Sequence, residues 1–176
     1  FVGKPCDVSA LTLLARRDPR IDAALVATVS FFCGGVPSLA IARSIVGRYG
    51  LAEADVGLLR WRGHGCPGMT RIESRDGAIF EQSYDETWGD ALNQEIQFRC
   101  KVCPDAVGLA ADIVCGDAWV TEDGYAHADY DGWNAVIGRT PRGLALLDAA
   151  ETAGTLRLEP LSSAELGRMQ PHHVER

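Results

Sequence analysis

The stretch that decides the fold is Leu25-Val26-Ala27-Thr28-Val29-Ser30-Phe31-Phe32-Cys33-Gly34-Gly35. Its first part, Leu25–Phe32, is rich in β-branched and aromatic residues, which predicts a buried strand. The Cys-Gly-Gly sequence then breaks the strand, and Pro37–Tyr49 has a helical pattern with proline near its first turn and Gly50 after its last. A buried strand followed directly by a helix is typical of an α/β fold.

Strand and helix patterns alternate along the rest of the chain. Phe1-Val2 reads as the end of a strand, and apolar spacing predicts a helix over Asp7–Arg17. Further strands are expected at Val56–Trp61, Asp112–Cys115, Trp133–Arg139 and Leu156–Leu158, and further helices at Tyr84–Gln97, Pro141–Thr152 and Ser162–Met169. The last helix has a capping box, formed by Ser162 and Glu165. A polar loop is expected over Gly116–Gly132.

A β-hairpin interrupts this alternation. Met69–Ser74 and Ala78–Ser83 flank Arg75-Asp76-Gly77, and Asp-Gly is a strong hairpin turn signal. We therefore predict a single domain over residues 1–176 with an α/β fold. The expected architecture is a mixed, partly parallel sheet flanked by helices, with a β-hairpin insertion near residues 69–83.

Composition excludes several classes of function. The net charge of −7 makes the chain a poor candidate for non-specific nucleic-acid binding. The longest mostly apolar stretch, Ala23–Cys33, is too short to span a bilayer, and no signal peptide is visible. We therefore expect a cytoplasmic protein without a membrane span. Because a natural start rarely falls at the end of a strand, we also expect the chain to be the C-terminal portion of a longer protein.

Four of the six cysteines are candidate metal ligands. Cys6 and Cys33 each follow a predicted strand and precede a helix, and in an α/β sheet such strand ends lie along the edge where ligands bind. Cys100-Lys101-Val102-Cys103-Pro104 adds a C-x-x-C turn followed by proline, as in bacterial ferredoxin motifs. This set matches a [4Fe–4S] cluster, but spacing alone leaves zinc, a redox dithiol or simple burial open. Cys66 and Cys115 are predicted to be non-ligands, and for Cys66, within Gly65-Cys66-Pro67, approach to a cofactor stays open.

Signals for a phosphate-bearing cofactor are weaker, because the chain has no G-x-G-x-x-G fingerprint. Gly3-Lys4-Pro5-Cys6 leads into a helix whose N–H groups can bind phosphate. Arg62-Gly63-His64-Gly65-Cys66-Pro67-Gly68 is a loop whose glycines allow close approach of the backbone to a ligand. Within it, His64 is the candidate proton donor. The cations that can face an anionic ligand are Arg60, Arg62, Arg99, Lys101, Arg139 and Arg142.

At these residues the chain resembles the beta subunits of coenzyme F-420 hydrogenases and dehydrogenases. Relatives of that family include formate dehydrogenase beta subunits and 7-hydroxymethyl chlorophyll a reductase. The matching segments are Val2–Leu11, Phe31–Ser38, Arg62–Gly68, Arg99–Asp105, Ala111–Asp117 and Trp133–Thr140. The resemblance spans nearly the whole chain and corresponds to the C-terminal portion of the family.

The resemblance implies an iron–sulfur flavoprotein that binds FAD and passes electrons between a [4Fe–4S] cluster and the flavin. Hydride exchange with coenzyme F-420 or another small organic substrate would follow. Matched residue by residue, the resemblance assigns the cluster to Cys6, Cys33, Cys100 and Cys103. We place the cofactor near a second set of residues, consisting of Lys4, Arg62, Gly63, Gly65, Gly68, Asp112, Gly116 and Asp117. The expected partner is another redox subunit or an electron-donor protein.

Two other functions stay open at the level of the sequence. An electron-relay subunit would carry the cluster for a partner enzyme and would bind no flavin. A zinc-stapled α/β binding domain would hold one zinc ion and would be colourless. The metal and flavin contents of the purified protein distinguish these three possibilities.

Overall fold

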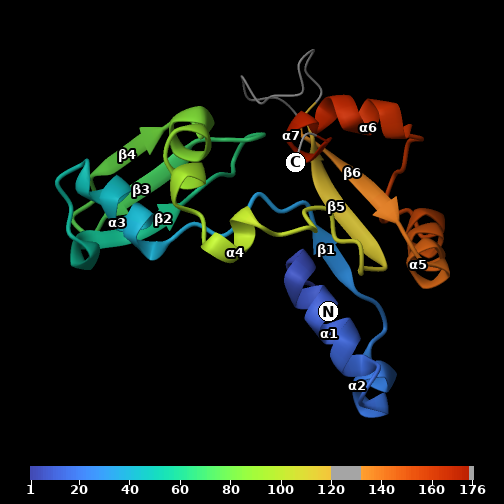
Figure 1. Ribbon diagram of the computed structural model, residues 1–176. Helices are drawn as coiled ribbons and strands as arrows, with labels where there is room; N and C mark the ends of the chain where they lie inside the picture. Colours follow the sequence, from blue (N-terminus) through green and yellow to red (C-terminus); the bar gives the residue numbers. More distant parts are fainter. Residues whose placement is uncertain (120–131, 175–176) are drawn as a thin grey trace. The chain divides into compact units, whose positions relative to one another are not determined.

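The chain passes from one folded unit to another after Cys33 and returns after Cys103 (Figure 1). The computed structural model describes residues 1–119 and 132–174. The first unit consists of Phe1–Cys33 and the described residues of 104–124 and 133–176, and the second consists of Gly34–Cys103 and the described part of 125–132. Where the sequence predicts one domain, the structure has two units, each with its own sheet and hydrophobic core.

The first unit contains a mixed three-stranded sheet in the order β1-β5-β6. β1 (Val29–Phe31) pairs in parallel with β5 (Ile113–Ala118), and β5 pairs antiparallel with β6 (Trp133–Gly138). Val2 adds a parallel bridge to Val29 at the free edge of β1. These pairings confirm the predicted α/β class with a mixed, partly parallel sheet.

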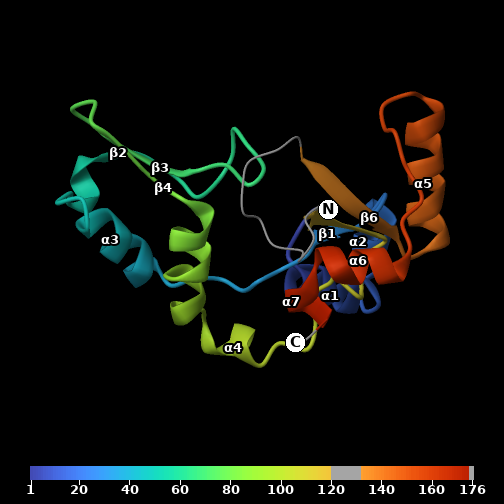
Figure 2. The same ribbon diagram turned by 90° about the horizontal axis from the view of Figure 1, so that it is seen from above.

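Helices surround this sheet (Figures 1 and 2). The described helices of the first unit are α1 (Pro5–Ala15), α2 (Pro19–Ala24), α5 (Pro141–Thr152), α6 (Ser163–Met169) and α7 (Pro171–Val174). Proline begins α1, α2 and α5, where its missing N–H costs no helical hydrogen bond. The predicted capping box of α6 is confirmed, since Ser162 Oγ accepts from the Glu165 N–H at 3.2 Å and Glu165 accepts from the Ser162 N–H at 2.9 Å. No described helix is long and apolar enough to cross a membrane.

A small core packs α1 onto one face of the first sheet. Val8 of α1 is fully buried and lies in one cluster with Ala111 and Val114, and Val114 pairs across the sheet with Ile137. Burying a valine side chain contributes about 1.5–3 kcal/mol to the free energy of unfolding. The apolar residues of β5 therefore hold α1, with Cys6 in its first turn, against the sheet.

Close packing on both faces requires glycine in β5, in β6 and in α5. A Cβ atom on Gly116 would lie 2.7 Å from the Phe32 ring, and one on Gly138 would lie 2.6 Å from Leu144 of α5. A Cβ atom on Gly143 would lie 2.2 Å from the carbonyl oxygen of Asp112. These distances are shorter than any normal contact. The positions of the Phe32 ring and of the first turn of α5 therefore depend on the absence of side chains at these glycines.

The second unit contains an antiparallel three-stranded sheet in the order β2-β3-β4. Its strands are β2 (Val56–Arg60), β3 (Thr70–Ser74) and β4 (Ile79–Gln82). Its helices and turns are α3 (Leu39–Gly47), η1 (Glu53–Asp55), η2 (Asp85–Gly89), η3 (Leu92–Glu95) and α4 (Phe98–Lys101). The predicted hairpin is present as β3 and β4, and β2 extends it to a third strand.

One face of the second sheet is apolar and the other is charged. Ile72 of β3 is buried with Ile45 of α3 and Leu92 of η3, which together form the centre of this core. The neighbouring side chains Arg71 and Glu73 are only half-buried, as the two-residue period of a strand requires. The sheet therefore presents arginine and glutamate side chains on the face opposite to α3.

Several local predictions differ from the structure. The helix expected over Tyr84–Gln97 is replaced by the short turns η2 and η3, which lie on either side of Asp90 and Ala91. The short strand expected at Leu156–Leu158 does not form, and Leu156 is exposed without a strand partner. Helix α2 is additional, although Asp18 as N-cap and Pro19 at the first position are its ordinary signals. The loop expected over Gly116–Gly132 lies mostly outside the described residues.

The close approach of α5 to β5 gives a stability prediction. Gly143→Ala should lower the free energy of unfolding by about 1–3 kcal/mol, because the added methyl group must displace the Asp112 carbonyl or the helix. Gly167→Ala on α6 is the matched control, since its Cβ would make an ordinary 3.5 Å contact, and it should stabilise by up to about 1 kcal/mol. Urea unfolding followed by circular dichroism measures both. Equal stabilities for the two variants would contradict this packing.

Candidate functional site

Cys6 and Cys33 leave the first sheet in the same direction. The parallel bridge pairs Val2 with Val29, and the N–H of Gly3 donates to the Val29 carbonyl at 3.0 Å. Each cysteine follows its bridge residue by four positions, so the two segments run in register toward the same end of the sheet. The sequence predicts this arrangement for neighbouring parallel strands.

The local settings of these two cysteines differ. Cys6 lies in the first turn of α1 and is exposed. Cys33 is half-buried, and its N–H donates to the carbonyl of Ala106 at 2.9 Å. That bond joins the end of β1 to the segment that follows Cys103 by three residues.

Cys100 and Cys103 lie on one backbone turn of the second unit. Cys100 is in α4, and the Cys103 N–H donates to the Cys100 carbonyl at 3.4 Å. Gly35 lies against this turn with φ +119°, and a Cβ atom there would be 3.4 Å from Cys100 Cβ. Within the second unit, Gly35 therefore packs against the C-x-x-C turn.

The four predicted ligands are divided between the two units. Cys6 and Cys33 belong to the first unit, and Cys100 and Cys103 belong to the second. Within the part of the chain that the structure describes, no group of three or more histidine, cysteine, aspartate or glutamate side chains is gathered as a metal site. The set of four ligands therefore stays a prediction. Local geometry supports the Cys6–Cys33 pair in the first unit and the Cys100–Cys103 pair in the second.

The two remaining cysteines occupy other settings. Cys115 lies in β5 opposite Val136, and burial raises the pKa of its thiol, so its thiolate is disfavoured. Cys66 lies in the glycine-rich loop, and a Cβ atom on Gly132 would be 2.8 Å from its sulfur. That Cys115 is not a ligand stays a prediction.

The Arg62–Gly68 loop folds tightly on itself. The Gly63 N–H donates to the Pro67 carbonyl at 3.2 Å, and a Cβ atom on Gly68 would lie 2.4 Å from the Gly63 carbonyl oxygen. Gly63 and Gly68 have φ angles of +124° and +74°, which favour glycine. His64, with φ +60°, also adopts the left-handed conformation and is exposed at the tip with Gly65. The loop is thus a closed cradle that a side chain at position 68 would disrupt.

An aromatic pair adjoins this loop through Arg62. The guanidinium of Arg62 lies 5.8 Å from the centre of the Tyr84 ring, and this ring stacks on Trp88 at 6.1 Å. Trp88 Nε1 is buried without a hydrogen-bond partner among the described residues. The motifs of the sequence do not point to either aromatic residue, although a spacing of four residues in a predicted helix is the available signal.

Asp112 has a structural setting. Its side chain is 9% exposed, and its carboxylate accepts hydrogen bonds from the N–H and hydroxyl of Thr28 at 2.8 and 2.9 Å and from the hydroxyl of Thr140 at 2.5 Å. Burial acts to raise the pKa of Asp112, but the hydrogen bonds from Thr140 and Thr28, with the nearby Arg142, outweigh it and lower the pKa. Both carboxylate oxygens are therefore occupied by the protein.

The other predicted cofactor residues also have protein contacts. The Asp7 carboxylate accepts from the N–H of Lys4 at 3.2 Å and from its ammonium group at 2.5 Å, so a phosphate at α1 would compete with Asp7. Gly116 leaves room for the Phe32 ring. The backbone carbonyl of Asp117 accepts from Gln170 at 2.5 Å. Of the predicted loop residues, Gly65 is exposed at the tip beside His64, Arg62 and Gly63 are half-buried, and Gly68 is buried.

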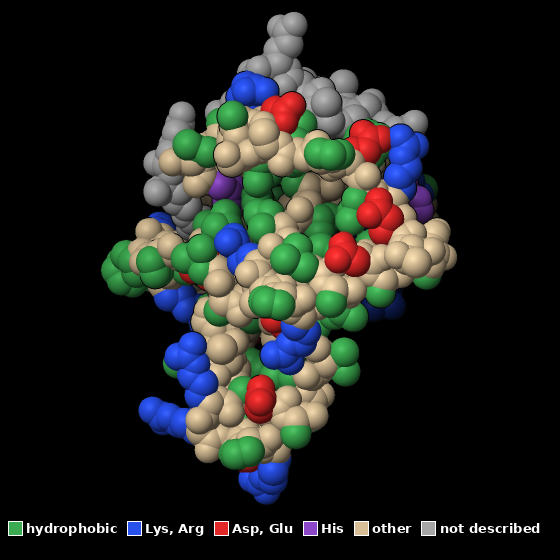
Figure 3. All heavy atoms as spheres, turned by 90° about the vertical axis from the view of Figure 1, so that its right-hand side faces the viewer, with side chains coloured by type: hydrophobic (Ala, Val, Ile, Leu, Met, Phe, Trp, Pro, Cys, Tyr) green, Lys and Arg blue, Asp and Glu red, His purple; other side chains and the backbone are tan. Residues whose placement is uncertain are grey.

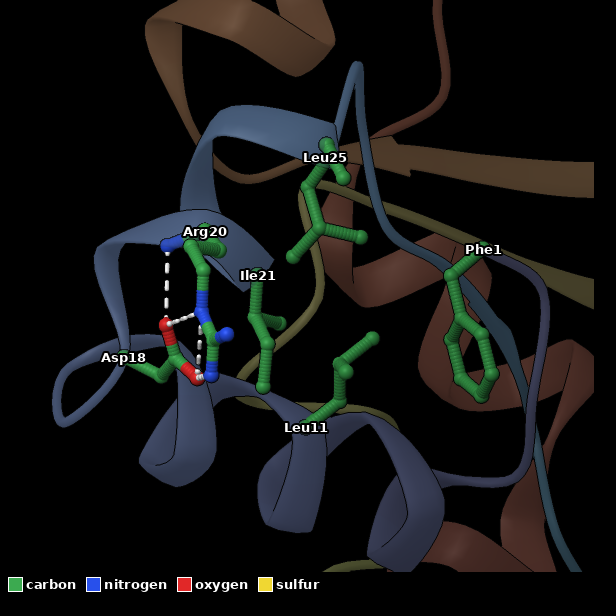
Figure 4. Close-up of a pocket in the computed structure, with 7 residues that line it drawn as sticks. Phe1, Leu11, Asp18, Arg20, Ile21 and Leu25 are labelled. Carbon is green, nitrogen blue, oxygen red and sulfur yellow. Dashed lines mark hydrogen bonds and ion pairs between the residues drawn. The ribbon is translucent and has the colours of Figure 1, made fainter.

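A shallow apolar pocket lies between α1 and α2 (Figure 4). Its volume is about 500 Å³, and its lining residues are Phe1, Leu11, Asp18, Arg20, Ile21, Ala24 and Leu25. Asp18 and Arg20 pair with each other at 2.6 Å, and this hydrogen bond lowers the pKa of Asp18. Because its two charged groups satisfy each other, the pocket offers no unpaired charge for chemistry.

The fold and the thiol-bearing strand ends define an α/β protein with a candidate redox site. The chain belongs to the family formed by the C-terminal part of coenzyme F420 hydrogenase/dehydrogenase beta subunits, whose model matches residues 1–164. This match confirms the resemblance predicted from the sequence.

A solved structure shares the fold. The chain is similar to a chain of the xenon-derivatized F420-reducing [NiFe] hydrogenase complex from Methanosarcina barkeri, with 21% identity and a TM-score of 0.60. The match covers 99% of this chain and 60% of that chain. A comparison with curated proteins gives no match.

The buried Asp112 carboxylate generates a pH prediction. Asp112→Asn should lower the free energy of unfolding by about 1.5–3 kcal/mol near neutral pH, because hydrogen bonds to a charged group are lost. Since folding lowers the Asp112 pKa, the charged form stabilises the fold above its ordinary pKa of 3.8, and this stabilisation is lost as the pH falls below it. The difference in free energy of unfolding between the wild type and Asp112→Asn, measured by urea unfolding, should therefore become smaller at acid pH.

The control for this measurement is Asp148→Asn, an exposed residue of α5. Its effect should stay within about 0.5 kcal/mol. A wild-type advantage over Asp112→Asn that persists unchanged through acid pH would show that the charge of Asp112 does not stabilise the fold.

Proposed function

We propose that the protein is an iron–sulfur flavoprotein oxidoreductase that moves electrons between a [4Fe–4S] cluster and FAD. The observation that carries the proposal is the parallel register of Val2 and Val29, which sends Cys6 and Cys33 toward the same end of the sheet. Membership of the coenzyme F420 hydrogenase/dehydrogenase beta subunit family supports a redox function.

The donor set suits a cluster. Four cysteine thiolates are the usual ligands of a [4Fe–4S] centre. Within the first unit, Cys33 is hydrogen-bonded to Ala106, and within the second unit Gly35 packs against Cys100. The grouping of all four thiols is proposed from the resemblance to the family. The roles of this chain would be to supply the thiolates from two strand ends and one turn and to limit access of water to them.

The flavin is placed at the Arg62–Gly68 loop. The cradle closed by Gly63 and Gly68 and the stack of Tyr84 on Trp88 support this placement. When bound, the flavin supplies the ability to exchange either one or two electrons, which links a one-electron cluster to hydride chemistry. The loop backbone would hold the cofactor, Arg62 would orient the aromatic stack, and His64 at the loop tip would donate a proton to the substrate.

Coenzyme F-420 or another small organic molecule is the proposed substrate, and a redox subunit or an electron-donor protein is the proposed partner. The similar solved chain is part of a hydrogenase complex. Exposed apolar side chains support docking of this kind: Figure 3 shows hydrophobic side chains interspersed with acidic and basic ones on the face on which α5 lies. The exposed large apolar residues of α5 and of the segment after it are Leu144, Leu146, Leu156 and Leu161. Because the thiols would need reducing conditions, we place the protein in the cytoplasm.

The cluster is tested by metal analysis of protein purified without oxygen. We expect about four irons and four sulfides per chain, with a broad absorbance shoulder near about 400 nm, and we expect Cys100→Ser to lose both. Cys115→Ala is the control and should retain them, since Cys115 lies within β5. Stoichiometric zinc in a colourless protein would refute the redox proposal and favour the zinc-stapled binding domain.

The flavin site is tested by titrating FAD and following the quenching of its fluorescence. Gly68→Ala should weaken FAD binding at least about tenfold, because the added methyl group forces the loop open against the Gly63 carbonyl. Gly77→Ala is the matched control, because it has the same kind of backbone strain, at φ +96°, but nothing within 4 Å of its Cβ. Its FAD affinity should equal that of the wild type. A cluster-containing protein that binds no FAD would favour the relay subunit instead.

A further inference from the structure

The cations that the sequence offers for an anionic ligand have different surroundings. The side chains of Arg139 and Arg142 donate to backbone carbonyls, and that of Arg99 donates to Gln97. Arg62 lies over an aromatic ring. The Nε atoms of Arg60 and Arg139 are both buried without a hydrogen-bond partner, but Arg60 differs from the other four because its whole side chain has no hydrogen bond, ion pair or ring contact with any described residue.

The position of Arg60 makes this lack of a partner unusual. Arg60 is the last residue of β2 and lies directly opposite Arg71 of β3. Arg71 is paired with two carboxylates, Glu73 at 2.6 Å and Glu81 at 3.2 Å, and these bonds raise its pKa. Both neighbouring acids are therefore directed to Arg71, and the charge of Arg60 is not neutralised.

This arrangement is unfavourable unless an anion completes it. Like charges directly opposite each other on adjacent strands destabilise a sheet. A buried donor without an acceptor adds the cost of its lost hydration. A site that binds an anion has these two properties before its ligand arrives, since the ligand supplies both the missing charge and the missing acceptor.

Arg60 also adjoins the glycine-rich loop. A Cβ atom on Gly63 would lie 3.7 Å from Arg60 Cδ and 3.8 Å from its Nε, so the arginine stem runs along the first glycine of the loop. Because Gly63 has no side chain, only its backbone lies beside the edge of the guanidinium that carries the buried Nε. That edge can donate two parallel hydrogen bonds to a phosphate group.

We propose that Arg60 binds the diphosphate of the flavin cofactor and fixes it beside the Gly63–Gly68 cradle. This inference rests on the proposed function, in which FAD occupies that loop. It assigns to Arg60 the anionic part of the ligand, while the loop and the aromatic pair contact the rest. Arg60 therefore determines the binding preference for FAD over flavins that lack phosphate.

The experiment compares the binding of FAD and riboflavin, which has no phosphate, by fluorescence quenching. Arg60→Gln should weaken FAD binding by about tenfold to a hundredfold and change riboflavin binding less than about twofold. Arg60→Lys should retain part of the FAD affinity, because it keeps the charge but not the planar fork. Arg48→Gln, an exposed arginine that ends α3, is the control and should bind both as the wild type does.

Stability separates a binding role from a structural one. Without ligand, Arg60→Gln should be at least as stable as the wild type in urea, because it removes an unpaired charge beside Arg71. Lower stability, or equal weakening of FAD and riboflavin, would overturn the proposal, as would unchanged FAD affinity.

Inorganic pyrophosphate distinguishes this inference from the proposed function. Pyrophosphate should compete with FAD for the wild type. If the wild type binds no flavin, the proposed function fails. Pyrophosphate binding that is then lost in Arg60→Gln would still establish the anion site, whereas absence of pyrophosphate binding would overturn it as well.

Discussion

One buried carboxylate fixes the sheet of the first unit. Asp112 immediately precedes β5, and its oxygens accept hydrogen bonds from Thr28, which precedes β1, and from Thr140, which precedes α5. The backbone adds to this link, because the Asp112 N–H donates to the Thr28 carbonyl at 3.0 Å. A carboxylate with several donors holds its charge even when buried. The position of β1, and therefore of Cys33 at its end, depends on this residue.

Local signals predict much of the fold. The Ser162–Glu165 capping box and the Asp76-Gly77 turn both form where the sequence places them, because their causes lie within a few residues. The Asp112–Thr28 contact joins residues 84 positions apart, and no local pattern shows it. The division into two units depends on such long-range contacts, so the sequence alone predicts one domain with a hairpin insertion.

The candidate site divides in the same way. The cysteines are visible as residue types at strand ends, and the Val2–Val29 bridge gives the first pair a common direction. The setting of Arg60 is not visible, because it depends on the strand register that places it opposite Arg71 and on Glu73 and Glu81 bonding to Arg71 instead. The spatial neighbours of a charged residue in a strand cannot be identified until the pairing of the strands is known. Motifs therefore show which residues to consider, and pairing shows which of them lack a partner.

Two neighbouring parallel strands always need a crossover connection. Between β1 and β5 that connection contains Gly34–Cys103, which has its own sheet and its own core. Closing a flexible chain of this length would cost considerable entropy. In a folded insert the two ends are already held in place. Just outside this insert, the N–H of Cys33 donates a hydrogen bond to the carbonyl of Ala106. The entropic cost of pairing β1 with β5 is thus reduced to that of a much shorter loop, and the sheet tolerates changes of length within the insert.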